Sequence, residues 1–186
     1  PLVTGVQTCA LPISELAAQH RLPVKIHTGY YAGNNNMPMD RIHASHLSGL
    51  LTAYPQTRFV LMHTAYPFGG EVLALAKHYA NVYADMCWAW SIDALSSELF
   101  VRQFLHTAPA NKLFIFGGDV GWPHATVAYA WQARRGLERA LQAEIDAGYL
   151  SETQAIGLAR RWMRDNAYAC FEVQRTQQQI ASEVSR

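Results

Sequence analysis

Four short apolar segments constrain the fold of this chain more than any other feature of its sequence. They cover residues 23–27, 58–63, 81–86 and 112–119, and their starts lie about 23 to 35 residues apart. Each segment is rich in β-branched or aromatic residues and is bounded by turn-forming residues, which is typical of a strand. Longer stretches with helical spacing of apolar residues separate them. This alternation predicts strand–helix units whose strands pair in parallel.

The length of the chain limits how many such units it holds. A complete (β/α)₈ barrel needs roughly 250 residues, whereas this chain has 186. We therefore expect an α/β fold that is a partial (β/α)₈ TIM barrel, made of four βα units and C-terminal helices. An open doubly wound sheet is the alternative, but the sequence lacks the glycine-rich dinucleotide fingerprint after a first strand. The spacing therefore favours the barrel.

Helices are predicted between the strands and after the last one. Residues 14–20 form the end of a helix, because Pro23 disfavours helical geometry just before it. Further helices are expected over 40–54, 70–79, 96–106 and 124–147. Ser151 and Gln154 form a capping-box pattern that opens another helix. The polar residues 174–186 are expected to form a tail.

The first residues are expected to differ in origin from the rest. Residues 3–13, VTGVQTCALPI, resemble the translation of a widely used short-read sequencing adapter, and they lack the basic and apolar regions of a signal peptide. We therefore expect residues 1–13 to be a non-native segment. Residues 14–173 would then form the domain, as a fragment of a protein that continues upstream.

Composition excludes several classes of partner. The formal net charge is +1 and 50% of the residues are hydrophobic, so the sequence predicts no nucleic-acid partner. No apolar run approaches the roughly 20 residues that span a bilayer, so no membrane partner is expected either. The cysteines, at positions 9, 87 and 170, form neither a disulfide framework nor a zinc motif. We expect a cytoplasmic protein with a small-molecule substrate and a capacity to form homo-oligomers.

Metal-binding side chains recur at the ends of the predicted strands. His27, His63 and Asp119 end the first, second and fourth strands, and Asp85 lies near the end of the third. In a barrel these ends meet at one mouth, and imidazole and carboxylate groups are common zinc ligands. A single histidine is more often structural, but three such groups at equivalent positions predict a metal site.

Other residues near the strand ends have two interpretations. His43 and His46 could share a metal at their helical spacing, but the apolar pattern favours a structural role. Tyr66, Trp88 and Trp122 are candidate substrate-binding residues, because tyrosine and tryptophan combine a flat apolar face with a polar edge. They, and Trp90 with them, could equally pack between strands and helices. Residues 34–36 form either a polar lid or a solvated loop.

Several of these segments together resemble one family. The motifs KIHTG (25–29), LMHTAYP (61–67), FGGD (116–119) and RDNAYACF (164–171) are similar to the C-terminal half of the amidohydrolase superfamily. More narrowly, they resemble its amidohydrolase-related branch, which includes decarboxylases of carboxylated substrates. The resemblance covers residues 23–173 and implies that the four strands are strands 5–8 of the barrel.

The resemblance also implies roles for individual residues. His27 matches a histidine that ligates metal, and His63 matches one that ligates a second metal or orients the catalytic water. Asp119 matches an aspartate that contacts the metal and transfers the proton, so Asp119 and His63 are the expected catalytic residues. The implied cofactor is a divalent metal, zinc or alternatively manganese. The family's first-strand His-x-His pair has no counterpart in this sequence.

Four functional hypotheses follow. The first is a fragment of a metal-dependent hydrolase or lyase that breaks C–N or C–O bonds or decarboxylates its substrate, with a metal-activated water and Asp119 as base. The second is a sugar-acid isomerase that resembles the uronate isomerases. The third is an inactive, truncated half-barrel whose exposed edges and apolar face cause self-association. The fourth, metal-free, uses Asp85 and Asp119 as a glycosidase-like carboxylate pair.

Overall fold

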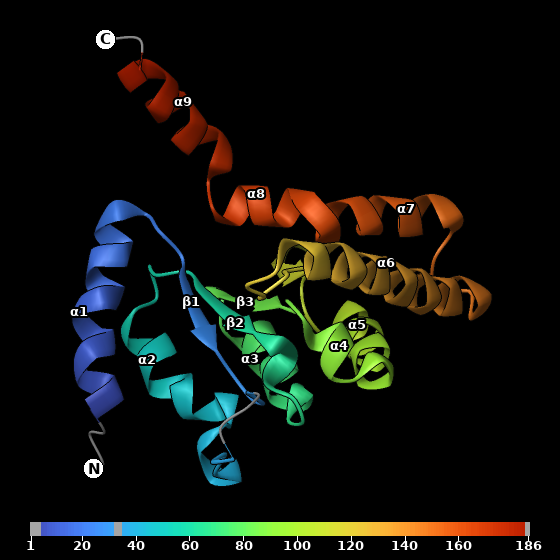
Figure 1. The fold of residues 1–186 in the computed structure, drawn as a ribbon, viewed down its shortest axis with the longest axis horizontal. Helices are drawn as coiled ribbons and strands as arrows, with labels where there is room; N and C mark the ends of the chain where they lie inside the picture. The colour runs from blue at the N-terminus through green and yellow to red at the C-terminus, as the bar shows by residue number, and fades with distance from the viewer. Residues whose placement is uncertain (1–4, 32–34, 185–186) are drawn as a thin grey trace.

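A four-stranded parallel sheet forms the centre of the protein. The computed structural model describes residues 5–31 and 35–184 (Figure 1). The strands, in the spatial order β1-β2-β3-β4, are β1 (Val24–His27), β2 (Phe59–Met62), β3 (Val82–Asp85) and β4 (Leu113–Phe114). The predicted α/β class and the parallel pairing are confirmed. The four strands occur in the order expected for consecutive units of a barrel.

One helix precedes β1, and further helices follow each strand. They are α1 (Gly5–His20), α2 (Ser48–Ala53), α3 (Gly69–His78), α4 (Ala89–Ile92), α5 (Ala94–Thr107), α6 (Pro123–Asp146), α7 (Glu152–Arg160), α8 (Asn166–Cys170) and α9 (Val173–Val184). A π-helical turn, Arg161–Asp165, joins α7 to α8. Ser151 caps α7 through the predicted capping box with Gln154. Within the described part of the chain, no helix combines the length and apolar character needed to cross a bilayer.

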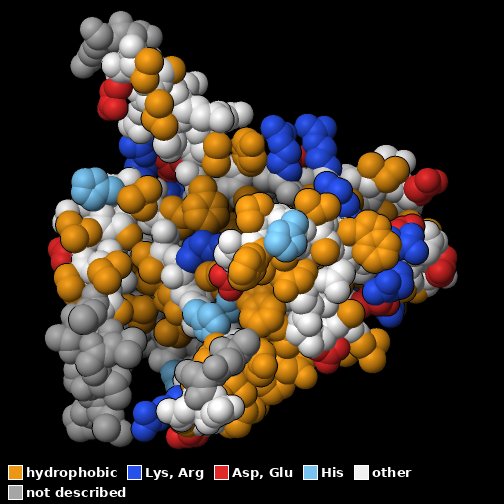
Figure 2. All heavy atoms as spheres, in the orientation of Figure 1, with side chains coloured by type: hydrophobic (Ala, Val, Ile, Leu, Met, Phe, Trp, Pro, Cys, Tyr) orange, Lys and Arg blue, Asp and Glu red, His pale blue; other side chains and the backbone are white. Residues whose placement is uncertain are grey.

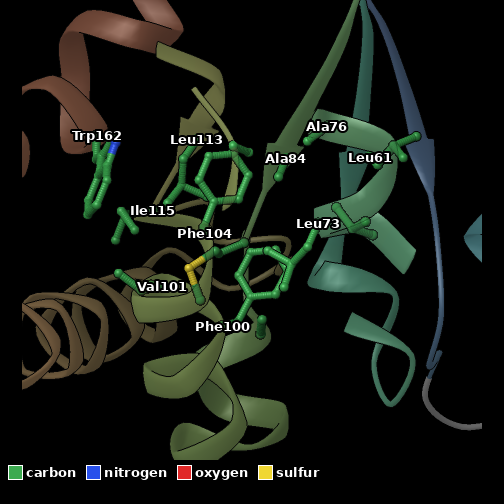
Figure 3. Close-up of a cluster of buried hydrophobic side chains, with 14 of the residues drawn as sticks. Leu61, Leu73, Ala76, Ala84, Phe100, Val101, Phe104, Leu113, Ile115 and Trp162 are labelled. Carbon is green, nitrogen blue, oxygen red and sulfur yellow. The ribbon is translucent and has the colours of Figure 1, made fainter. Parts of the chain in front are cut away.

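One face of the sheet packs against α3 and α5 to form the main core. Because side chains alternate along a strand, Leu61 and Ala84 point to this face, where they meet Leu73 and Phe104 (Figure 3). Trp162, from the π-helical turn, is buried in the same cluster and donates its indole N–H to the Ala110 carbonyl oxygen at 2.8 Å. The core therefore covers one face of the sheet, and the opposite face is left for other contacts.

The opposite face of the sheet is only partly covered. Val60 and Phe114 form a small buried cluster there with Cys170 of α8. Lys25 and His27 lie on this same face of β1 by strand alternation, and both are exposed. Near the middle of the molecule, Figure 2 shows basic, acidic and histidine side chains gathered among hydrophobic ones.

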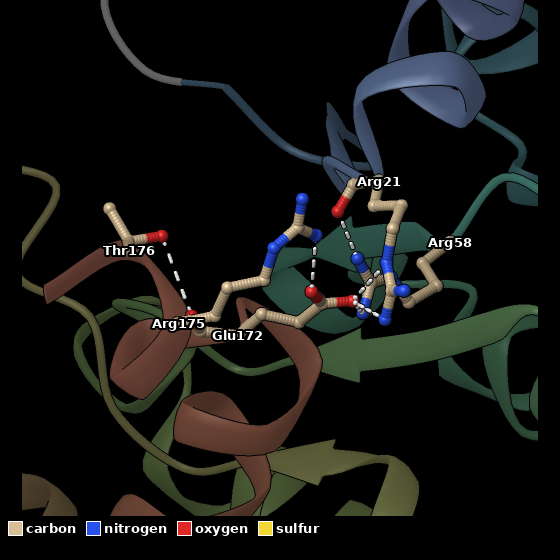
Figure 4. Close-up of polar contacts among 5 residues, drawn as sticks. All are labelled: Arg21, Arg58, Glu172, Arg175 and Thr176. Carbon is tan, nitrogen blue, oxygen red and sulfur yellow. Dashed lines mark hydrogen bonds and ion pairs between the residues drawn. The ribbon is translucent and has the colours of Figure 1, made fainter. Parts of the chain in front are cut away.

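A charged cluster attaches the C-terminal helices to the beginning of the sheet. The Glu172 carboxylate pairs with Arg21, Arg58 and Arg175 at 2.9, 3.1 and 2.8 Å (Figure 4). Hydrogen bonds from Arg175 and Arg21, with the positive charges of Arg21 and Arg58, lower the pKa of Glu172 to about 2. Beyond this cluster, α9 extends away from the body and buries no residue (Figure 1). The predicted polar tail is therefore helical as far as Val184.

Two predicted elements differ from the structure. The helix expected over 40–54 is broken into Met39–Arg41, Ala44–Leu47 and α2. The break occurs where His43 and the Ser45 backbone N–H bind the Glu71 carboxylate, at 2.7 and 2.9 Å. These contacts to α3 replace helical hydrogen bonds.

The fourth strand is shorter than predicted. β4 ends at Phe114, because the next backbone groups leave the sheet: Ile115 N–H bonds the Trp162 carbonyl oxygen at 3.2 Å, and Gly117 N–H bonds that of Cys87 at 3.3 Å. Asp119 therefore lies in a loop rather than at the end of a strand. The helix predicted to end at residue 20 does so, and it begins at Gly5 within the segment expected to be non-native.

Candidate metal centre

The candidate site lies at the carboxyl ends of the strands. His27 is the last residue of β1, and His63 directly follows β2. Strand register aligns the ends, with His27 opposite Met62 and Met62 opposite Asp85. The register of the sheet therefore brings the residues at the strand ends close to one another, as the sequence predicts.

The backbone around His63 is unusual. His63, Thr64 and Ala65 all have positive φ angles, of 64°, 56° and 51°. Such conformations cost energy in residues other than glycine and tend to occur at functional sites. They turn the chain sharply, and the His63 side chain ends up completely buried.

The loop after β1 holds this turn in place. The Thr28 hydroxyl donates to the Met62 carbonyl oxygen, and Tyr30 N–H donates to that of Tyr66 at 2.8 Å. Gly29 lies between them with φ +72°, and a Cβ atom there would lie 2.3 Å from the carbonyl carbon of Ala65. Only glycine allows the two loops to approach this closely.

Three side chains offer donor atoms to one point. A ring nitrogen of His63, the thiol sulfur of Cys87 and a carboxylate oxygen of Asp119 all lie within 4.8 Å of one another. His63 Nε2 is 3.5 Å from Asp119 Oδ2. The His27 ring lies beside this group, with its centroid 4.5 Å from that of His63. The structure thus brings His27, His63 and Asp119 together, as the sequence predicts, and adds Cys87.

Burial controls the charge of the histidines. Burial and, to a smaller extent, the neighbouring His27 lower the pKa of His63 to about 4, although Asp119 opposes the shift. Burial also lowers the pKa of His27, against the effect of Asp119. Both shifts favour the neutral imidazole, which is the form that binds metal.

Asp85 is engaged by other groups. Its Oδ2 atom lies 2.7 Å from the Lys25 ammonium group, and its Oδ1 atom accepts the Cys87 N–H at 2.9 Å. Burial raises the pKa of Asp85, and Lys25 opposes this. Burial lowers the pKa of Lys25, but the Asp85 carboxylate more than offsets this, so the net shift is upward. Asp85 therefore holds the Cys87 backbone in place and is not one of the three clustered donors.

Cys87 and Lys25 were not predicted as site residues. Cys87 follows the end of β3 by two positions, so its place after a strand is the signal that could have identified it. Burial, with the nearby Asp85 and Asp119 carboxylates, raises the pKa of its thiol to about 12. The Lys25 side chain shares the open face with His27, two residues further along the strand, and alternation alone could have placed it there.

The predicted substrate-binding aromatics separate into two groups. Trp88 lies edge-on to His63 at 5.8 Å between ring centroids, and Tyr30 links it to Tyr66 at 6.4 Å on each side. Trp122 is 68% exposed at the start of α6, and its ring lies 6.2 Å from that of His124. Trp88 therefore borders the cluster, and Tyr66 is linked to it only through Tyr30 and Trp88. Trp122 has no ring contact with the cluster among the described residues.

Other residues considered in the sequence have structural places. Trp90 is buried in the core and donates its indole N–H to the Ile115 carbonyl oxygen at 3.0 Å. His43 pairs with Glu71 and stacks on Phe68 with centroids 3.9 Å apart. In the 34–36 segment, the Asn36 carbonyl oxygen accepts the Tyr31 hydroxyl, and Asn34 lies outside the described residues.

The donor set fits a divalent ion. Among the described residues, neither ring nitrogen of His63 has a hydrogen-bond partner, although the side chain is fully buried. Buried polar atoms are nearly always paired, so an unpaired imidazole facing a carboxylate indicates a missing partner. Nitrogen, oxygen and sulfur are the donor atoms that zinc takes in proteins.

Comparisons with known proteins agree with this fold. Protein FluG of Emericella nidulans is 27% identical over 168 residues, which cover 90% of this chain and 19% of FluG. A Lactobacillus casei protein assigned as a metal-dependent hydrolase superposes with a TM-score of 0.76 at 17% identity, over 91% of this chain and 44% of its own. A uronate isomerase from Thermotoga maritima superposes with a TM-score of 0.73 at 14% identity, over 92% of this chain and 43% of its own.

These relatives are all longer than the matched region, and this chain spans less than half of each. At these identities the two solved structures establish similarity of fold. The sequence model of the amidohydrolase family matches residues 5–173, which is most of the chain. The chain therefore belongs to the amidohydrolase family.

Proposed function

We propose that this chain supplies part of the active site of a metal-dependent hydrolase or lyase, in which His27, His63 and Asp119 hold a divalent ion. Zinc is the proposed ion, with manganese as the alternative. The observation that carries this proposal is the buried His63 imidazole, which has no hydrogen-bond partner among the described residues and lies 3.5 Å from the Asp119 carboxylate. Family membership and fold similarity to a metal-dependent hydrolase support it.

We further propose that the four βα units correspond to the second half of an eight-stranded barrel. The chain covers 44% and 43% of two solved chains with this fold. The order of the KIHTG, LMHTAYP and FGGD motifs matches that half and, more narrowly, the amidohydrolase-related branch. Further ligands would then come from the other half.

The side chains can perform distinct steps. When bound, a divalent ion polarises a carbonyl group and acidifies water. Asp119, which is partly exposed in its loop, can take a proton from the attacking water and return it to the leaving group. Tyr66 and Trp88 offer flat apolar surfaces to a small-molecule substrate, for which a carboxylated compound is our first candidate.

Zinc content tests this function. The 186-residue protein is incubated with zinc, dialysed and measured by elemental analysis. We expect bound zinc that His63→Ala removes and that His46→Ala leaves unchanged, because His46 is an exposed histidine outside the cluster. Equal zinc in all three proteins would overturn the assignment of His63 as a ligand.

A sugar-acid isomerase is the second candidate, because the fold is similar to that of the Thermotoga maritima uronate isomerase. In that reaction Asp119 would move a proton between substrate carbons instead of between water and a leaving group. Incubation of the metal-loaded protein with uronic acids separates the two. Isomerised sugar acid would favour this candidate, and its absence beside hydrolysis or decarboxylation of other substrates would favour the first.

A further inference from the structure

We propose that Cys87 is an additional metal ligand at this site and that its thiolate makes the site prefer zinc over manganese. This inference rests on the proposed function. Its basis is the meeting of the Cys87 sulfur with donor atoms of His63 and Asp119, all within 4.8 Å of one another. A cysteine was not among the ligands that the sequence predicted.

The backbone of Cys87 is fixed on both sides. Its N–H donates to the Asp85 carboxylate at 2.9 Å, and its carbonyl oxygen accepts the Gly117 N–H at 3.3 Å. The residue has a positive φ of 51°. Asp85 is in turn held by Lys25 at 2.7 Å. The thiol is thus presented from a constrained position, which favours a ligand over a side chain that only fills space.

An independent observation points to a ligand at the same place. His63 is fully buried, and neither ring nitrogen has a hydrogen-bond partner among the described residues. An imidazole in this situation needs a group that accepts its lone pair. Because the thiol of Cys87 is close to it, a single ion can bind one ring nitrogen of His63 and the Cys87 sulfur together.

The distances require only a small adjustment. Two atoms bound to one zinc ion lie about 3 to 4 Å apart, so the donor atoms need to approach by about 1 Å. The Asp119 side chain is 45% exposed and lies in a loop after β4, so its carboxylate can approach the other two donors.

Coordination changes the protonation of the thiol. The S–H bond is replaced by a sulfur–metal bond, and the proton leaves to solvent, so no oxidant or reductant is needed. Thiolate is a soft ligand that suits zinc, whereas manganese prefers carboxylate and water oxygen. Cys87 would therefore change the choice of metal as well as the affinity.

Cobalt(II) spectroscopy tests the proposal directly. The test protein carries Cys9→Ser and Cys170→Ala, so that Cys87 is its only thiol. A matched protein carries Cys87→Ser in addition, and circular dichroism checks that both fold. We expect cobalt(II) to give the first protein a near-ultraviolet thiolate-to-metal charge-transfer band that the second lacks. Cys87→Ser should also weaken cobalt binding about tenfold or more and narrow the zinc-to-manganese affinity ratio by a similar factor.

The other outcomes separate this inference from the proposed function. Cobalt that binds without the band, and that His63→Ala releases, would overturn the role of Cys87 and leave the metal site intact. Absence of cobalt binding in the parent protein would overturn both. Because the band is measured in the protein that retains Cys87, the test holds even if the Cys87→Ser protein is unstable.

Discussion

The Lys25 ammonium group lies 2.7 Å from the Asp85 carboxylate. Lys25 is on β1 and Asp85 is on β3, so this ion pair spans the strand between them, β2. Asp85 is almost completely buried, whereas Lys25 is partly exposed. The pair therefore joins two strands that do not hydrogen-bond each other. The pair also contacts Cys87, whose N–H donates to the same Asp85 carboxylate.

Removing the cation of this pair should destabilise the protein. Lys25→Met leaves a buried carboxylate without its partner, which costs about 2 kcal/mol of unfolding free energy after allowance for the exposure of Lys25. Chemical denaturation measures the change. The double variant Lys25→Met/Asp85→Asn should recover part of the loss, since the amide is neutral and its oxygen still accepts the Cys87 N–H. A double variant less stable than the single one would contradict this account.

The contact between the first two loops should make Gly29 irreplaceable. Gly29→Ala places a methyl group against the Ala65 backbone at a positive φ, so we expect a loss of about 2 kcal/mol or more. Gly157→Ala is the matched control, because this glycine lies within α7 and nothing lies within 4 Å of its added Cβ. The control should gain about 0.5 to 1 kcal/mol. Equal changes in the thermal unfolding midpoint for Gly29→Ala and Gly157→Ala would show that the two loops can move apart to admit a methyl group.

The arginine cluster around Glu172 should stabilise the protein in a pH-dependent way. The folded pKa of Glu172, about 2, lies below its ordinary value of 4.5. Its stabilisation is therefore complete above pH 4.5 and is lost as pH falls towards 2. The denaturation midpoint of Glu172→Gln should lie below that of the parent at pH 6, and the two should converge near pH 2. A constant difference between them would rule out titration of Glu172 as the cause.

The two histidines should differ in their effect on metal retention. His63 belongs to the group of three clustered donors, whereas His27 lies beside that group. We expect His63→Ala to abolish zinc retention and His27→Ala to weaken zinc binding by about 10- to 100-fold. Competition with a chelator of known affinity measures both. Tighter binding by the His63→Ala protein than by the His27→Ala protein would reverse the assignment.

Local sequence patterns predict most of the helices and strands. They do not predict where contacts between distant residues break a helix or shorten a strand. The strands and α3, α5, α6 and α7 follow from periodicity and capping, which depend on neighbours in the sequence. The break within 40–54 depends on Glu71 of α3, and the early end of β4 depends on Trp162. Contacts between residues so far apart cannot be read from a local pattern.

The sequence also predicts part of the candidate site but not all of it. His27 and His63 were found because they end or follow strands, and parallel strands bring such residues together. Cys87 was missed because a single cysteine has no characteristic spacing, and its approach to His63 depends on a left-handed backbone that sequence does not reveal. Lys25 was missed because its partner Asp85 lies two strands away.

The parallel register described for the sheet also controls when the proposed metal site can form during folding. Its three clustered donors follow three different strands, and a slip of one residue in any pairing would turn that strand's side chains to the opposite face. The cluster can then assemble only after the pairings of β1, β2 and β3 and the return of β4 are complete. Metal uptake during refolding should consequently be a late event, and its rate would report the final alignment of the strands.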